Sequence, residues 1–184
     1  MTMSISIRKL LGVISRVVLL TSLVSVVPMF AVGQTKAQDH PASTLVQMVR
    51  QATAQYKDVN NAVSAGYAQL LGCMAGTDHG SMGIHYLNSA LNDGTIDVNH
   101  PQALMYEPFD GKLQLTGAEY IVDAATWLAA NPGPPVLENQ TFLYVPAPNR
   151  FNIPAFFELH VWAWKDNPQG AFVDWNNAVN CDHQ

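Results

Sequence analysis

Residues 103–122 read ALMYEPFDGKLQLTGAEYIV, and this stretch decides the fold. Two runs of strand-forming residues, 103–107 and 112–122, flank Pro108 and a turn at 109–111 that contains Asp and Gly. Asp and Gly tolerate the backbone conformations that a tight turn demands, and two such runs around a short turn are typical of a hairpin. The stretch therefore predicts two antiparallel strands.

Short strands also dominate the segments around this hairpin. We expect them at 82–87, 141–145, 155–165 and 171–175, with a short helix at 124–130. The chain contains 11 Pro and 12 Gly residues, and strands do not alternate regularly with long helices. These features favour a mainly antiparallel sheet over a doubly wound parallel fold.

One long helix is expected before the sheet. Ser43 is a suitable N-cap for it, and Gly66 a suitable end. Between them, apolar residues recur at steps of three and four, at Leu45, Met48, Val49, Ala52, Tyr56, Val59 and Val63. Such a stripe is typical of an amphipathic helix. We therefore predict an α+β fold, in which a long N-terminal helix packs on a mainly antiparallel curved sheet or partial barrel.

Residues 1–37 have the pattern of a secretory signal peptide. Basic residues precede an apolar run at 17–27, and small residues then permit cleavage after Gly33 or Ala37. Thr and Ser interrupt the run, which is shorter than the about 20 residues of a membrane span. An uncleaved anchor is the alternative. We expect residues 38–184 to form a single globular domain that is periplasmic or secreted.

Composition and charge narrow the function classes. Of the 184 residues, 48% are hydrophobic and 12% are charged, which excludes an intrinsically disordered chain. Cleavage after Ala37 would leave five scattered basic residues against all 14 acidic ones, a net charge of −9. Such a surface argues against binding to nucleic acid or to anionic membranes. A small molecule or a metal ion is the expected partner.

The sequence has two cysteines, Cys73 and Cys181. Export would place them in an oxidising compartment, where a disulfide between them would close a loop of more than 100 residues. A thiol nucleophile or a metal thiolate is the alternative, but the sequence has no CxxC spacing to support either.

Strand alternation places one acid among apolar residues. Leu113, Leu115, Gly117, Glu119 and Ile121 are expected on one face of the 112–122 strand. A lone buried carboxylate would cost several kcal/mol or become neutral. Glu119 therefore needs a metal ion, a basic side chain or several hydrogen-bond donors.

The 155–165 strand has two different faces. Phe157, Leu159, Val161 and Ala163 form a core face, whereas Phe156, Glu158, His160, Trp162 and Trp164 form the other. Large aromatic side chains are seldom exposed together. We therefore predict that this face either lines a pocket or is covered by another element. In the first case, Phe156, Trp162 and Trp164 line a ligand pocket, with the acid and the imidazole beside them.

These residues could form a metal site. His85 follows a glycine-rich loop at 72–83. Together with Glu119, His160 and Glu158 it would provide nitrogen and oxygen ligands suited to zinc, copper or iron. The alternative is structural: His85 and Glu119 form an internal hydrogen-bonded pair, and His160 binds a backbone carbonyl.

Other catalytic motifs are weak or absent. The sequence contains neither GxGxxG nor GxxxxGK, and residues 80–83 do not fit GxSxG. Pairing of Glu119 with Glu107 or Glu158 would permit glycoside hydrolysis, which needs two acids about 5–10 Å apart.

The sequence resembles small exported bacterial proteins that carry HYxN, EYIV and LHVWxWxxNPxGxFxDWN segments, here at 85–88, 119–122 and 159–176. The segment LTGAEYIV at 115–122 is also similar to one in the oil-body-associated protein family of plants and fungi. The resemblance implies that these segments belong to one compact domain. Association with lipid droplets does not carry over, because that family lacks a leader, whereas residues 1–37 of this sequence have the pattern of one.

Three functions follow as hypotheses. The first is an exported small-ligand or metal-binding domain that uses His85, Glu119, Glu158 and His160. The second is a metal-assisted or acid/base hydrolase that uses the same residues. The third is a structural envelope protein whose aromatic face contacts a partner.

Overall fold

The computed structural model describes residues 43–182, so the predicted signal peptide at 1–37 lies outside the described residues. The elements are, in chain order, α1 (Thr44–Thr53), the 3₁₀ helix η1 (Ala54–Lys57), α2 (Val59–Ser64), β1 (Ala68–Gln69), β2 (Met74–Gly76), β3 (Gly80–Leu87), the 3₁₀ helix η2 (Ser89–Leu91), β4 (Ala103–Phe109), β5 (Lys112–Asp123), α3 (Ala124–Ala130), β6 (Val136–Leu137), β7 (Gln140–Thr141), β8 (Leu143–Val145) and β9 (Phe156–Val161).

A mainly antiparallel sheet forms the body of the described chain. Its strand order is β1-β3-β4-β5-β9-β8, with β2 added to β3, and β6 and β7 form a separate small sheet. The predicted hairpin is confirmed, since β4 and β5 pair antiparallel from Ala103↔Glu119 to Phe109↔Lys112. Asp110 and Gly111 both have positive φ, which these two residue types accommodate in a tight turn.

The predicted long N-terminal helix is wrong. The 43–66 stripe divides into α1, η1 and α2. The Thr53 hydroxyl donates to the Val49 carbonyl at 2.6 Å, and Asp58 adopts an extended backbone and caps a new helix through the amide of Asn60. Ser, Thr, Asn and Asp compete in this way for backbone groups, and apolar spacing alone does not register the competition.

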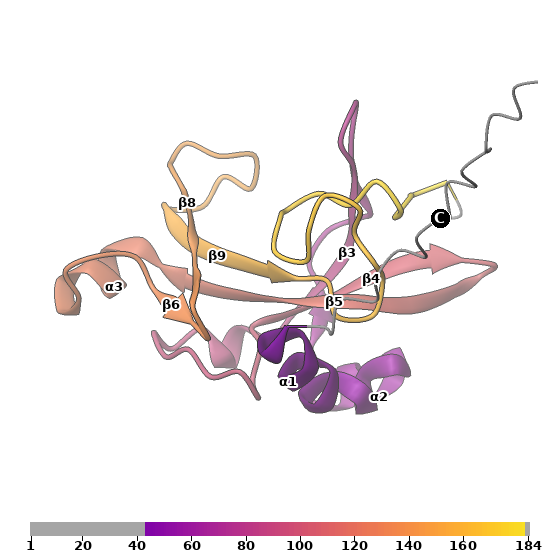
Figure 1. Ribbon diagram of the computed structural model, residues 1–184, viewed down its shortest axis with the longest axis horizontal. Coiled ribbons are helices and arrows are strands. Elements are labelled where there is room, and N and C mark those ends of the chain that lie inside the picture. The colour runs from indigo at the N-terminus through magenta and orange to yellow at the C-terminus, as the bar shows by residue number, and fades with distance from the viewer. Residues whose placement is uncertain (1–42, 183–184) are drawn as a thin grey trace, which may run out of the picture. The chain divides into compact units, whose positions relative to one another are not determined.

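The two faces of the sheet have different neighbours. α1 and α2 lie on one side of β5 and β9, and the C-terminal segment lies on the other (Figure 1). The helix side is the main core, which includes Leu45, Val46, Val49, Leu104, Tyr106, Leu115, Ala118, Tyr120, Val122, Phe157, Leu159 and Val161. The opposite face, here called the pocket-side face, carries His85, Glu119, Glu158 and His160.

A β-bulge in β5 separates two groups that strand alternation had placed together. Met105 pairs with Gly117 but Tyr106 pairs with Leu115, so Thr116 is the extra residue. Leu115 consequently packs in the helix-side core, while Glu119 faces the other way. A Cβ at Gly117 would collide with the Val161 carbonyl and the Met105 side chain. The predicted common face of Leu115 and Glu119 is therefore wrong, because an extra residue inverts a two-residue period.

The last predicted strands are shorter than expected or absent. β9 ends at Val161, and the amides of Trp164 and Lys165 then donate to the Thr116 carbonyl. The 171–175 segment forms no strand, and a single bridge joins Ser81 to the neighbouring Asn176. After Val161 the chain thus leaves β9 and folds over the pocket-side face of the sheet (Figure 1).

A disulfide joins Cys73 to Cys181, as predicted, with 5.7 Å between their Cα atoms. It fixes the C-terminal segment beside β2, and it is consistent with an extracellular location. Among residues 43–182, no helix has the length and apolar character needed to cross a membrane.

Candidate metal centre

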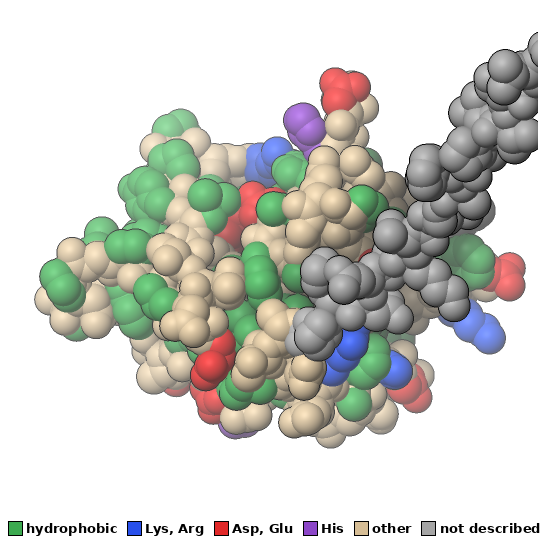
Figure 2. All heavy atoms as spheres, viewed as in Figure 1, with side chains coloured by type: hydrophobic (Ala, Val, Ile, Leu, Met, Phe, Trp, Pro, Cys, Tyr) green, Lys and Arg blue, Asp and Glu red, His purple; other side chains and the backbone are tan. Residues whose placement is uncertain are grey.

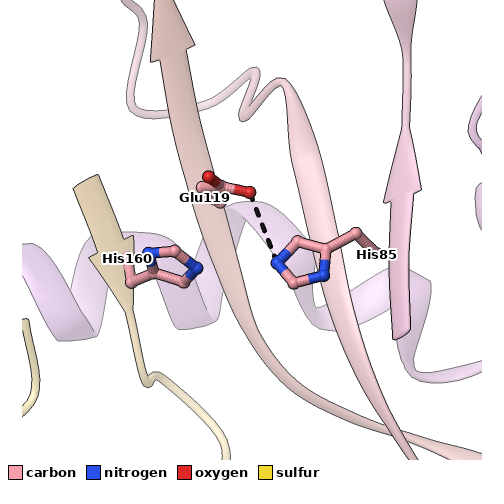
Figure 3. Close-up of side chains that lie close together, drawn as sticks. All are labelled: His85, Glu119 and His160. Atoms are coloured by element: carbon pink, nitrogen blue, oxygen red, sulfur yellow. Dashed lines mark ion pairs between the residues drawn. The ribbon is translucent and has the colours of Figure 1, made fainter. Parts of the chain in front are cut away.

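Three strands bring His85, Glu119 and His160 together on the pocket-side face. Glu119 on β5 is the direct cross-strand partner of His160 on β9. β4 lies between β5 and β3, and its residue opposite Glu119 is the small Ala103. Figure 3 shows the Glu119 carboxyl between the two imidazole rings, one from each side. The sheet register therefore fixes this juxtaposition.

The three side chains are buried and close. His85, Glu119 and His160 are 4%, 5% and 1% exposed. Nε2 of His85 lies 3.4 Å from Oε2 of Glu119, and the two imidazole centroids are 5.8 Å apart. One ligand atom from each of the three residues lies within 4.8 Å of the others. The group is therefore compact enough to surround one ion.

The polar atoms of this group lack ordinary hydrogen bonds. Among the described residues, Nδ1 of His85 and both ring nitrogens of His160 have no hydrogen-bond partner. Buried polar groups are rarely left in this state. The 3.4 Å pair distance exceeds that of a normal hydrogen bond, but it matches the separation of about 3.3–3.4 Å between two ligands of a tetrahedral zinc ion. The alternative in which His160 binds a backbone carbonyl is wrong, because neither of its nitrogens does so.

A second acidic group flanks His160 on the side of the C-terminal segment. Glu158, His160 and Asp174 also offer ligand atoms within 4.8 Å of one another, and Nδ1 of His160 lies 3.5 Å from Oδ1 of Asp174. Asp174 was not predicted from the sequence. A usable signal was present, because Asn167, Pro168 and Gly170 lie between the strands expected at 155–165 and 171–175 and favour a turn that brings the second segment back toward the first.

Burial and charge give the two histidines opposite properties. Burial lowers the pKa of His85 to about 4, against the weaker opposing effect of Glu119. Burial also opposes charge on His160, but Glu119, Asp174 and Glu158 outweigh it and raise the pKa of His160 to about 9. At neutral pH the metal-free site thus holds a neutral His85 and a protonated His160.

Glu158 is held in its neutral form. Burial is the main cause, and the negative charge of Glu119 adds to it, so that the pKa of Glu158 rises to about 9 despite the opposing effect of His160. A neutral Glu158 can donate a hydrogen bond at pH 7. In the metal-free site, a protonated Glu158 therefore lies beside the negatively charged Glu119.

A cavity of about 440 Å³ opens over the group. His85, Glu119, Glu158 and His160 line it together with Phe156, and most other lining residues are apolar: Leu70, Leu71, Met74, Met82, Leu87, Ile121, Phe151, Ile153 and Pro154. Asn92 and Asp123 complete the lining. An ion held by the three ligands would border a largely apolar pocket.

The structure places the two tryptophans away from this cavity. Trp162 is 3% exposed, stacks on His160 with ring centroids 6.2 Å apart, and donates to the Val173 carbonyl. Trp164 donates to Thr53 of α1 and lies under the Lys57 ammonium, on the helix side. The predicted pocket face is wrong for Trp164, because the strand ends before that residue. Trp162 packs against the His160 ring and does not line the cavity.

Glu107 and His100 have partners outside this group. Glu107 is 2% exposed but pairs with Lys165 at 2.7 Å, so it does not form a pair with Glu119. His100 forms an exposed pair with Asp97, also at 2.7 Å. That pair shows the ordinary geometry that the buried group lacks.

No protein-family model matches the chain, and no match to it is found among curated proteins or among solved structures. Function is therefore inferred from the chemistry of the site.

Proposed function

We propose that this chain is an exported metal-binding protein that holds one divalent transition-metal ion through His85, Glu119 and His160. The single observation that carries the proposal is that Nδ1 of His85 and both ring nitrogens of His160 have no hydrogen-bond partner inside a buried, compact group. An ion at this point would bind one nitrogen of each imidazole, which would leave the second nitrogen of each ring as a hydrogen-bond donor, and it would neutralise the carboxylate. A protein that left the ring nitrogens unpaired would bear a free-energy cost of about 1–3 kcal/mol for each group.

The ligand set favours borderline metals. Two imidazoles and one carboxylate suit zinc, iron(II) and copper(II), whereas magnesium and calcium prefer oxygen ligands alone. The chain offers no free thiolate, because both cysteines form the disulfide. We use zinc as the reference ion because its ligand distances fit the observed separation of 3.4 Å.

We assign to Asp174 the role of a carboxylate that orients the His160 ring from the side of Nδ1. Metal-binding histidines usually donate the second ring N–H to a carboxylate, which fixes the tautomer and the ring orientation. Nδ1 of His160 faces Asp174 at 3.5 Å, so the other nitrogen remains for the ion. Glu158 lies close enough to serve as a further oxygen ligand or as a hydrogen-bond donor to whatever completes the coordination.

A metal-assisted or acid/base hydrolase is the second candidate. Its acid/base form is favoured by Glu158, which in the metal-free site has the raised pKa of a general acid beside Glu119. An ion with a coordination position open to the pocket could also activate a water molecule. Turnover of ester, glycoside or peptide substrates by the zinc-loaded protein, lost in Glu158→Gln, would support this candidate. Zinc binding without any turnover leaves the binding function.

Export and a structural role remain proposals as well. Export is supported by the signal-peptide pattern and by the disulfide. A partner-binding role is supported by apolar side chains that gather over α3, β6 and β8 (Figure 2), where Leu128, Val136, Leu143 and Tyr144 are exposed. Self-association that depends on Leu143 would favour that role.

The test is a zinc titration of the oxidised protein after chelator treatment, read by calorimetry and by metal analysis of the dialysed product. We expect one equivalent of zinc. His85→Ala and His160→Ala should each weaken binding by more than about 100-fold, since even outer-shell changes cost about 10–100-fold. His100→Ala is the matched control, because it removes an exposed histidine of a histidine–carboxylate pair. Equal binding by all three variants would contradict the proposal.

A further inference from the structure

The lining of the cavity is strongly asymmetric. Ionisable groups converge where β3, β5 and β9 bring His85, Glu119 and His160 together. From there the wall along β5 continues with Ile121 and reaches Asp123. At about 3.4 Å per residue, the distance from Glu119 to Asp123 is about 14 Å. The cavity therefore has the dimensions of a short hydrocarbon chain with a polar group at one end.

The far end of the cavity along β5 is marked by Asp123, which already has a structural role. Asp123 caps α3, where its carboxylate accepts from the Thr126 amide at 2.7 Å. The rim is apolar, since Leu70, Leu71 and Ile153 are 49%, 46% and 45% exposed. Half-exposed leucine and isoleucine around an opening are stabilised when an apolar molecule covers them. The body of the ligand should accordingly be apolar.

Charge selects the end group of such a ligand. A divalent ion bound by two neutral imidazoles and one carboxylate retains one positive charge, which either Glu158 or an anionic group of a bound molecule would neutralise. Among the residues of 43–182 that line the cavity, none is Lys or Arg. A phosphate, which needs several donors, would be poorly compensated there, and an amine would be repelled by the ion. A single carboxylate fits this balance.

We propose that the cavity binds a small amphipathic carboxylate, whose carboxyl group coordinates the ion held by His85, Glu119 and His160 and whose hydrocarbon body lies along β5 toward Ile121 and Phe156. The inference rests on the proposed metal-binding function and names the ligand class of that site. The apolar rim provides chain-length selectivity, and the ion provides selectivity for the carboxylate.

The test measures acetate, butanoate, hexanoate and octanoate against the zinc-loaded and the zinc-free protein, by calorimetry or ligand-observed NMR. In the zinc-loaded protein we expect affinity to rise with each methylene, by up to about fourfold per group, which corresponds to about 0.8 kcal/mol. Octylamine should bind more weakly than octanoate. Without zinc, the preference for octanoate over octylamine should disappear.

One rim variant and one control variant outside the cavity distinguish ligand binding from ion binding. Leu71→Asp changes a half-exposed lining residue and should weaken octanoate binding while zinc affinity stays unchanged. Leu128→Asp, at a similarly exposed leucine of α3 outside the cavity, should change neither affinity. Zinc binding without dependence on chain length would overturn this inference but leave the metal site. An octanoate preference that persists without zinc would overturn the carboxyl–ion contact. Failure to bind zinc would overturn both proposals.

Discussion

Nε2 of His85 and Oε2 of Glu119 lie 3.4 Å apart, although β4 separates the strands that carry them. Both side chains are buried, and the Glu119 carboxyl reaches across the row that contains Ala103. Glu119 is also the cross-strand partner of His160. One carboxylate therefore links two imidazoles that are 75 positions apart in the sequence.

Glu119→Gln keeps the shape of the side chain and removes its charge. We expect the pKa of His160 to fall below about 9, because Glu119 is the strongest of the groups that raise it. Zinc affinity should fall by at least about 10-fold, since an amide is a poorer ligand than a carboxylate. NMR titration of the His160 ring protons measures the first effect, and calorimetry the second. An unchanged His160 pKa would contradict the assigned role of Glu119.

Asp174→Asn tests the residue behind His160. The variant should fold, because Asp174 is only partly buried, but zinc affinity should decrease by about 10–100-fold. Asp166→Asn, which alters an exposed acid of the same C-terminal region, is the control and should leave zinc affinity unchanged. If Asp174→Asn binds zinc as tightly as the unaltered protein, Asp174 does not orient His160.

The metal-free protein should lose stability as the pH rises from about 6.5 to 9. In this interval, His160 and Glu158 keep their protons in the folded state, where the pKa of each is about 9, but have lost them in the unfolded state. The folded state then binds more protons, so its stability falls with increasing pH. His85, whose pKa is lowered to about 4, has the opposite effect only between about pH 4 and 6.5.

Zinc should reverse this trend, because it binds the deprotonated ligands and its affinity increases as protons leave. Urea unfolding of the metal-free and the zinc-loaded protein at several pH values measures both slopes. Parallel slopes would show that the ion does not displace the proton of His160.

Removal of the disulfide should destabilise the fold without abolishing it. The bridge spans a sequence separation of 108 residues, for which the chain-entropy model gives a stabilisation of up to about 4–5 kcal/mol. The pair Cys73→Ser and Cys181→Ser should therefore lower the free energy of unfolding by an amount up to that size. Zinc affinity should also fall, since the bridge anchors the segment that carries Asp174. Chemical denaturation that gave equal stability would argue against this contribution.

Local patterns were sufficient to predict the hairpin, the two cysteines of the bridge and the three central site residues. Strand and turn residues at 103–122 are a short-range signal, and a carboxylate among apolar residues on a strand marks a site that needs a partner. That reasoning singled out Glu119, and the aromatic face of the next strand singled out His160. The metal role of these residues stays a prediction.

Features that depend on tertiary contacts were not predictable in this way. The bulge at Thr116 moves Leu115 to the helix side, and the early end of β9 moves Trp164 there as well. The N-terminal helix is interrupted after Thr53, whose hydroxyl donates to the Val49 carbonyl, and a new helix begins at the cap Asp58. In each case, side-chain and backbone hydrogen bonds override a regular hydrophobic period.

The central claim is most directly tested by a crystal structure of the zinc-loaded protein with anomalous scattering recorded at the zinc absorption edge. The account predicts one strong peak, about 2.0–2.2 Å from ring nitrogens of His85 and His160 and from a carboxylate oxygen of Glu119. A fully loaded crystal whose zinc lies elsewhere, for example at the exposed His100–Asp97 pair, would contradict it.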